Sequence, residues 1–398
     1  MFYITISLAA AVWVALTFLT RKWRAWRVRQ WVKGQLAIAS FGYVVDTSTE
    51  TYLRLRATEN RRLRAAFGIN NSLTTASRVE HQAFMTTAHL LVKNKRRNWE
   101  TLYGVAERFL QVELQTVAPR HLDLRSLRLA ESVRCMVLAV VLFDNFGIDP
   151  ATIPRDALVT ITEEINNQWL SSKCQPDDVT PSELLNSTID SLHLTSPSSP
   201  IGHQPLAPTE VLSLLMPQYE TLWRVVLLTF VTAYHYQADA YQDAEQRTAE
   251  VPSCLGTGDP ASEKEALQLA KEGLRLCPSN KHLYRSPLPT PGQPNPAPLA
   301  ADISSLHRHP SIWGRDAYLF RPSRFDSDDF TPAQREAYIP FSVGRHKCPA
   351  AGGFGERMVT LLVVALGRGL GPRVGSIQRG KKGLPTGRDE MEGWMFRF

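Results

Sequence analysis

Hydrophobic residues recur at helical spacing through most of the chain. Val79–Lys93 and Leu127–Phe146 carry apolar positions three and four residues apart, which predicts amphipathic helices. Leu212–Tyr236 predicts a longer apolar helix, and Pro217 inside it should remove one backbone hydrogen bond and kink it. We expect Gly393–Phe398 to form a terminal strand. The pattern indicates a mainly α protein with a small β portion.

The N-terminal segment predicts a membrane anchor. Phe2–Thr20 is an uncharged, mostly apolar run of 19 residues, long enough to span a bilayer, and a basic, Trp-containing segment follows it. A secretory signal peptide carries its basic residues before the apolar run, whereas positive residues after it keep that side cytosolic. We expect a transmembrane helix at 1–20, a basic, aromatic juxtamembrane linker at 21–37 and one domain at 38–398. This predicts a single-pass protein of the endoplasmic reticulum with its domain in the cytosol.

Three further stretches are interpreted from their composition. Residues 171–209 are polar and rich in Ser, Pro and Thr, and we expect a loop there. Pro287–Pro298 has six prolines in twelve positions and predicts a stiff surface loop. The apolar run Cys135–Phe143 is too short for a membrane span and is bounded by charged residues, so we interpret it as a buried core helix.

Charge and cysteine content narrow the function classes. The net charge of +7 is modest and suits an acidic membrane surface or an acidic electron donor. No nucleic-acid motif is present, and we expect no nucleic-acid partner. The five cysteines are scattered, which indicates neither a disulfide framework nor a zinc site and favours a reducing compartment. We interpret His307 and His309 as solvated surface residues, because their spacing suggests no closed metal site.

One cysteine lies in a distinctive loop. Phe341-Ser-Val-Gly-Arg-His-Lys-Cys348 is a basic stretch with a glycine, followed by Pro349 and a predicted helix. A lone cysteine is ordinarily a small buried hydrophobe. This loop, however, resembles the haem-ligand loop of cytochromes P450, with Phe341, Gly344 and Cys348 in register. His346 stands where that family has Arg, and Ala350 where it has Gly.

The resemblance implies a mainly α, P450-like fold, here shortened, that binds haem b with Cys348 as the axial ligand of the iron. A thiolate ligand pushes electron density onto the iron and favours O–O cleavage. Gly344 permits a tight turn, and Phe341 shields the sulfur. Arg345, His346 and Lys347 supply positive charge for the thiolate and the haem propionates. His346 is a weaker propionate partner than Arg, because it loses its charge near neutral pH.

Two more stretches resemble the same family. Glu272 and Arg275 lie three apart on a predicted short helix ended by Pro278, a spacing that by itself indicates an ordinary surface ion pair. They match the family's Glu-x-x-Arg helix, and the segment Trp313–Phe325 matches its meander. The resemblance implies that Arg324 joins Glu272 and Arg275 in a buried charge triad that holds the cysteine loop.

Glu220 and Thr221 stand where the family's oxygen-site helix carries an acid–alcohol pair that relays protons. A threonine hydroxyl both accepts and donates a hydrogen bond, and a carboxylate can feed it through water. The small residue pair that normally precedes them is absent, and Pro217 offers another way to open the helix. The alternative is that Glu220 and Arg224 form an ordinary i,i+4 ion pair and that Thr221 only packs.

The family's Trp-x-x-x-Arg propionate contact is not found. His81 and Met85 occupy one candidate helix for it, and Trp99 is followed by Tyr103 instead of Arg. His282 and Arg285 lie where the family places another propionate-binding basic residue, and we take His282 as the candidate.

The favoured function is that of a fungal-type haem-thiolate monooxygenase that oxidises an apolar small molecule in secondary metabolism. Its electrons would come from NADPH through a separate NADPH-cytochrome P450 reductase, because no flavin or dinucleotide motif exists here. Two alternatives stay open: a P450-type isomerase, dehydratase or cyclase that does not use dioxygen, and a catalytically decayed relative. The sequence does not reveal the substrate.

Overall fold

The computed structural model describes residues 2–44, 48–94, 97–117, 125–176, 178–195, 205–236, 238–248, 251–255, 260–293, 296–326, 329–379 and 388–398; it leaves undescribed the side chains of residues 2–11, 238, 239, 241, 252, 253 and 389. The first half of the chain contains α1 (Phe2–Ser40), α2 (Thr49–Glu59), α3 (Arg61–Phe67), α4 (Arg78–Val92), α5 (Trp99–Thr116), β1 (Ser126–Arg128), α6 (Leu129–Phe146), the 3-10 turn η1 (Pro150–Thr152), α7 (Arg155–Cys174) and α8 (Glu183–Asp190).

The second half begins with α9 (Pro208–Phe230), which continues into the π-helix η2 (Val231–Tyr236). It continues with α10 (Ala238–Arg247), α11 (Val251–Cys254), α12 (Pro260–Leu276), β2 (His282–Arg285), β3 (Leu299–Asp302), α13 (Ile303–Arg308), α14 (Pro310–Trp313), η3 (Pro322–Phe325), α15 (Pro332–Ala337), η4 (Gly344–His346), α16 (Phe354–Leu370), β4 (Ser376–Gln378), α17 (Asp389–Glu392) and β5 (Met395–Arg397). The predicted mainly α fold with a small β portion is confirmed.

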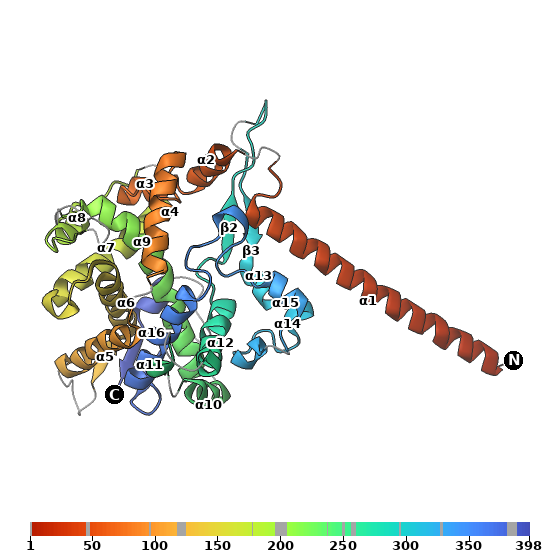
Figure 1. The fold of residues 1–398 in the computed structure, drawn as a ribbon. Coiled ribbons are helices and arrows are strands. Elements are labelled where there is room, and N and C mark those ends of the chain that lie inside the picture. Colours follow the sequence, from red (N-terminus) through yellow and green to blue (C-terminus); the bar gives the residue numbers. More distant parts are fainter. Residues whose placement is uncertain are drawn as a thin grey trace.

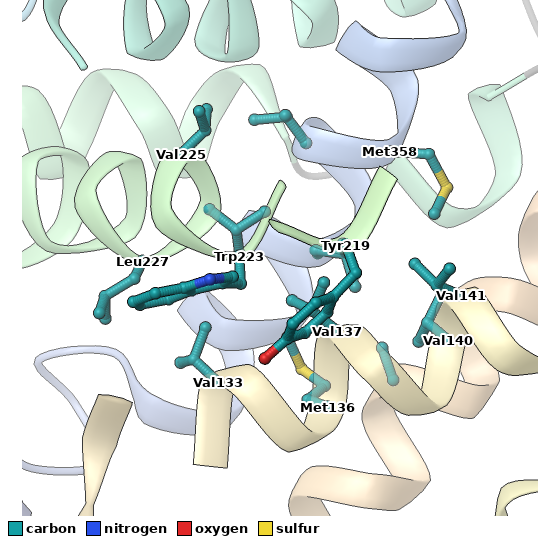
Figure 2. Packing of buried hydrophobic residues seen from close by; sticks show 14 of the residues in the cluster. Val133, Met136, Val137, Val140, Val141, Tyr219, Trp223, Val225, Leu227 and Met358 are labelled. Carbon is teal, nitrogen blue, oxygen red and sulfur yellow. The ribbon is translucent and has the colours of Figure 1, made fainter. Parts of the chain in front are cut away.

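Three helices form the centre of the core. In α6, Ala130 and every residue from Ser132 to Leu142 are buried, which confirms that Cys135–Phe143 belongs to a core helix. Figure 2 shows α6 valines packed against Tyr219 and Trp223 of α9, with Met358 of α16 beside them. The burial of large apolar side chains on all sides of α6 supplies most of the favourable free energy of packing here.

Helix α9 runs through Pro217 without a break in its assigned range. Proline has no N–H, so the carbonyl of Ser213, four residues earlier, has no partner within the helix. The side-chain amide of buried Asn71 donates a hydrogen bond to that carbonyl at 3.1 Å. A residue far away in the sequence therefore satisfies the backbone group that Pro217 leaves unpaired.

The strands form two small antiparallel sheets. The first has the order β1-β5-β4, with Leu127 and Ile377 both opposite Phe396. Strand β5 confirms the predicted terminal strand. In the second sheet β2 pairs with β3, with His282 opposite Asp302 and Arg285 opposite Leu299. The proline-rich stretch connects these two strands, and its described part contains a turn at 290–293.

Helix α1 projects from the helical body, with its N-terminus at the far end (Figure 1). Its C-terminal part packs on the second sheet, where the Gln35 side chain accepts a hydrogen bond of 2.6 Å from the Asp302 amide. Within the described residues, none of the helices combines the length and the apolar character needed to cross a bilayer. The predicted transmembrane helix at 1–20 has no support from the structure, and its first eleven side chains lie outside the described set. The domain limits at 20/21 and 37/38 stay predictions.

The predicted loop at 171–209 is partly wrong. Helix α7 runs to Cys174, and α8 spans Glu183–Asp190. The Ser182 hydroxyl caps α8 by accepting from the Leu185 amide at 3.2 Å, and Leu185 and Ile189 are buried. Two apolar residues four apart behind a serine cap suffice for this short helix, although the surrounding sequence is polar.

Candidate functional site

The loop that carries Cys348 is a tight, irregular turn. The Cys348 amide donates to the Phe341 carbonyl at 2.9 Å, which closes the loop. Ser342 and Gly344 both have positive φ angles, of 62° and 76°. A Cβ on Gly344 would also lie 3.0 Å from Cβ of Ser40 at the end of α1. Glycine is therefore needed here for both the backbone angle and the close approach of α1.

The Cys348 thiol is free and accessible at the surface of this loop. Partial burial among protein atoms raises its pKa, while the Ala350 amide and the Arg56 guanidinium act to lower it. Phe341 packs over the start of α16, where a Cβ on Gly355 would lie 2.6 Å from Cζ of the ring. Burial outweighs both, so the net pKa of Cys348 lies above its ordinary value, and the backbone amide and the cation offset only part of that shift.

A cluster of basic side chains lies beside the loop; we call Arg56, His81, Arg285 and His346 the cation cluster. Nη1 of Arg56 lies 3.3 Å from Nδ1 of His346 and donates to the Ser72 hydroxyl at 3.0 Å. Ser72 in turn lies 2.9 Å from Nδ1 of His81. Among the described residues, no carboxylate lies within ion-pair distance of Arg56 or Arg285, and the buried Nε2 of His346 has no partner.

The cluster changes the charge state of its members. Burial, with Arg56 and Arg285 nearby, lowers the pKa of His346 to about 3, so its imidazole is neutral near pH 7. Burial and Arg285 lower the pKa of Arg56 to about 10, which leaves it charged. The predicted positive charge of His346 is therefore wrong for this arrangement, because burial disfavours the charged ring and the neighbouring guanidinium groups add to that effect. Arg345 and Lys347 are exposed, and the Arg345 guanidinium lies 4.9 Å from the centre of the Tyr52 ring.

His282 does not reach the cation cluster. Successive side chains of a strand point to opposite faces, and His282 lies on the exposed face of β2 with its Nε2 3.8 Å from Oδ1 of Asp302. Arg285, three residues on, is buried on the other face and donates to the Ala39 carbonyl at 3.3 Å. Strand alternation therefore places Arg285, and not the candidate His282, beside the cysteine loop.

The structure brings Glu272, Arg275 and Arg324 together, fully buried. Arg275 donates two hydrogen bonds to the Glu272 carboxylate, at 2.6 and 2.7 Å, and Nε of Arg324 lies 3.2 Å from Oε1 of the same group. Arg275 also donates to the carbonyls of His307 and Ala317, at 2.7 and 2.6 Å. The triad thus ties α12 to the segment before the cysteine loop, and loss of one member would leave a buried charge uncompensated.

His307 is part of the same support and not the surface residue that we predicted. It is fully buried, and its Nε2 accepts a hydrogen bond of 3.0 Å from the Ile339 amide. Burial and Arg275 lower its pKa to about 3, which keeps the ring neutral and able to accept. His307 therefore links α13 to the chain two residues before Phe341.

Glu220 and Thr221 have partners within the protein. The Thr221 hydroxyl donates to the carbonyls of Pro217 and Gln218, at 3.1 and 3.4 Å. Glu220 is buried and bonded to the guanidinium of Arg388, a residue that the sequence patterns did not single out. Burial raises the Glu220 pKa, and Arg388 opposes that shift. Glu220 and Arg224 do not lie within ion-pair distance of each other, so the alternative i,i+4 ion pair is not formed.

The residues at the cysteine loop fit a thiolate-ligated haem. The free thiol supplies a soft ligand, and the cation cluster lacks a carboxylate partner among the described residues, as expected where anionic propionates bind. The orphaned Nε2 of His346 is a further polar atom that such a group would satisfy. Arg56 lies in this cluster although no local motif around it singles it out, so sequence patterns could not have pointed to it.

Comparisons with known proteins agree with this geometry. A model of the family "Cytochrome P450" matches residues 299–366. Benzoate 4-monooxygenase bphA of Aspergillus niger is 48% identical over 44 residues, or 11% of this chain and 8% of that protein. Amorpha-4,11-diene 12-monooxygenase of Artemisia annua is 31% identical over 120 residues, or 27% of this chain and 24% of that protein. These matches span no more than a quarter of either relative's length.

Solved structures match over most of the chain. The haem domain of cytochrome P450DA superposes with a TM-score of 0.53 at 15% identity, covering 85% of this chain and 81% of that one. A six-coordinated cytochrome P450 from Thermus thermophilus gives 0.52 at 18% identity, covering 84% and 82%. The fold is therefore the P450 fold, and the family match covers the segment that contains Cys348. The chain is therefore similar to cytochromes P450 in its fold and in the sequence around Cys348.

Proposed function

We propose that this protein is a haem-thiolate monooxygenase that binds haem b through Cys348 and inserts one oxygen atom into an apolar small molecule. The observation that carries the proposal is the free, accessible Cys348 thiol next to a cation cluster that has no carboxylate partner among the described residues. The bound haem would supply the activation of dioxygen. The two relatives named above are monooxygenases, which supports the same reaction class.

The chain's own residues then have distinct tasks. Arg56 and Arg285 hold the propionates by charge, and His346 donates or accepts through its unpartnered nitrogen. The buried triad of Glu272, Arg275 and Arg324 fixes the segment that leads into the cysteine loop. Electrons come from NADPH through a separate reductase, and the exposed Arg345 and Lys347 beside Cys348 suit an acidic donor surface.

Thr221 is proposed to pass protons at the oxygen site. Its hydroxyl donates to the Pro217 carbonyl and keeps lone pairs for a second hydrogen bond. Glu220 is the proposed proton source, in exchange with its partner Arg388. In Thr221→Ala, NADPH consumption should continue while product per NADPH falls, whereas Thr221→Ser should retain coupling. Unchanged coupling in Thr221→Ala would remove Thr221 from the relay.

We propose that α1 attaches the protein to the endoplasmic reticulum membrane with the domain in the cytosol. The support is a projecting helix whose apolar side chains are exposed, Trp13 by 68% and Leu19 by 60%, followed by exposed Trp23 and Trp26 among arginines. The stretch Asn186-Ser187-Thr188 is an acceptor motif for N-glycosylation. The full chain should float with microsomes, and Asn186 should stay free of glycan. A glycan at Asn186 would reverse the proposed topology.

One observation favours a second candidate, an isomerase, dehydratase or cyclase that does not use dioxygen. Both members of the acid–alcohol pair are engaged within the protein, Thr221 with its own helix and Glu220 with Arg388. Incubation of the haem-loaded protein with candidate substrates, with and without reductase and NADPH, separates the two. Product that requires both supports monooxygenation, and product without them selects the second candidate.

A further inference from the structure

A second group of cations lies away from Cys348, around Trp169 of α7. The guanidinium carbons of Arg62 and Arg388 lie 4.6 and 4.5 Å from the centre of the Trp169 ring, and Nζ of Lys173 lies 6.0 Å from it. Three cations therefore converge on one indole, from α3, α7 and the residue preceding α17. Arg224 of α9 is a fourth cation close to this group. Burial lowers its pKa most, and the charge of Arg388 lowers it further.

The positive charge in this group exceeds the negative charge. Glu220 is the one carboxylate, among the described residues, within ion-pair distance of any of the four, and it is bonded to Arg388. Arg134 and Glu392 nearby neutralise each other. Burial lowers the pKa of both Arg62 and Lys173, and the positive charge of Arg388 is the next largest cause. Like charges held together in this way raise the free energy of the protein unless an anion lies among them.

Unsatisfied donors point to the same conclusion. The buried atoms Nε of Arg388, Nε of Arg224 and Nε1 of Trp169 have no hydrogen-bond partner. Arg388 is only 4% exposed, so water does not readily replace a missing partner there. These three donors stay unpaired although one oxygen of Glu220 also lacks a hydrogen-bond partner.

The surroundings define the ligand further. Lys173 is exposed and Arg62 half-buried, so the group opens to solvent at α3 and α7, whereas Glu220 and Trp223 lie in the core. The half-buried Trp169 ring offers an apolar face beside the guanidinium groups. A flat or apolar body can pack on this ring while a carboxylate meets the cations. Glu220 adjoins Thr221, the proposed oxygen-site residue.

We infer that Arg62, Lys173, Arg224 and Arg388 form a binding site for a small organic carboxylate with an apolar body. That this carboxylate is also the substrate rests on the proposed function. The site itself does not, because it consists of residues other than those beside Cys348. Arg62 and Lys173 meet the ligand first at the surface, and Arg388 meets it at the buried end.

The test compares 2-naphthoate with its neutral amide, 2-naphthamide, by calorimetric titration of the haem-loaded protein. Haem loading fills the cation cluster beside Cys348, so that cluster does not compete for the anion. We expect naphthoate to bind at least about tenfold more tightly than the amide, since each charge-assisted contact removed costs about tenfold in affinity. The preference should weaken as salt is raised.

The variant Arg62→Gln/Lys173→Gln should lose the preference for the anion. Both side chains lie at or near the surface, so the variant should keep the native helix content and haem spectrum. Arg335→Gln is the matched control, because Arg335 is also a cation over an aromatic ring, 5.4 Å from the centre of Phe330, but lies on α15. Equal binding of the two probes, or a preference that survives in the double variant, would overturn the inference.

Naphthoate binding without any oxidised product would leave the anion site standing and count against the proposed monooxygenation. The reverse result, oxidation of neutral substrates with no anion preference, would reject the anion site alone.

Discussion

The basic side chains beside Cys348 differ in the charge that they carry. Arg56 keeps its charge, whereas His346 is neutral because burial, with the guanidinium groups of Arg56 and Arg285 nearby, lowers its pKa. A histidine in this position gives the propionates a hydrogen-bonding partner but little permanent charge. Arg56 and Arg285 therefore carry most of the electrostatic attraction.

Arg56→Gln should weaken haem retention roughly thirtyfold, because loss of one hydrogen bond to a charged group costs about 2 kcal/mol. The measurement is the rate of haem transfer to an acceptor globin. Arg54→Gln is the control, since Arg54 is exposed on the same helix, two residues away. Equal transfer rates for the two variants would contradict a propionate role for Arg56.

His346 should make protein prepared without haem less stable in acid. Its folded pKa of about 3 is below the ordinary value of 6.5, so the unfolded chain binds the proton first as pH falls. The stabilisation is complete above about pH 6.5 and is lost as pH falls from there toward 3. As the pH falls from 7.5 to 5.5, the free energy of unfolding should decrease by about 1.4 kcal/mol because of His346. Urea unfolding of His346→Gln should show a pH dependence smaller by that amount, and an unchanged dependence would contradict this assignment.

Single residues with a local motif were predictable from the sequence, and those without one were not. Glu272, Arg275 and Arg324 lie in recognisable stretches, and the structure brings them together. Arg56, Asn71 and Arg388 act through partners between about 140 and 290 positions away. The spacing of residues within one segment does not predict contacts with residues so far away in the sequence. The sequence could not show that Arg285, and not His282, faces the cysteine loop, because the direction of each side chain on β2 depends on the register of the strand.

Elements with strong apolar periodicity were predicted well. The predicted helices Val79–Lys93 and Leu127–Phe146 correspond to α4 and α6 within about two residues. Helix α8 was missed because its apolar face consists of two residues, Leu185 and Ile189, in a polar stretch. At α9 the sequence indicates a broken hydrogen bond at Pro217, but only the tertiary fold shows that Asn71 replaces it.

Asn71→Ala should destabilise the protein by about 1–3 kcal/mol, because the Ser213 carbonyl is then buried without a donor. Pro217→Ala restores a backbone N–H four residues after Ser213 and should offset part of this loss in the double variant. Urea unfolding of both single variants and the double variant measures the coupling. Purely additive effects would show that Asn71 does not compensate for Pro217.

At the scale of the whole molecule, the P450 fold places Cys348 and its cation cluster between elements from both ends of the chain. Helices α1 and α2 contact the second sheet (Figure 1), and α1 also contacts η4. The sequence identified the fold through three motifs within residues 270–356. It could not supply the pairing of β1 with β5, which joins Leu127 to Phe396, because nothing local specifies so distant a partner.

The most direct measurement is a carbon-monoxide difference spectrum of the reduced, haem-loaded protein and two cysteine variants. Cys174→Ala is the control, since Cys174 is the other exposed cysteine in the chain. We predict the red-shifted Soret band of a thiolate-ligated haem in the native protein and in Cys174→Ala, and its loss in Cys348→Ala. An unchanged band in Cys348→Ala, or a folded native protein that takes up no haem, would contradict Cys348 as the axial ligand.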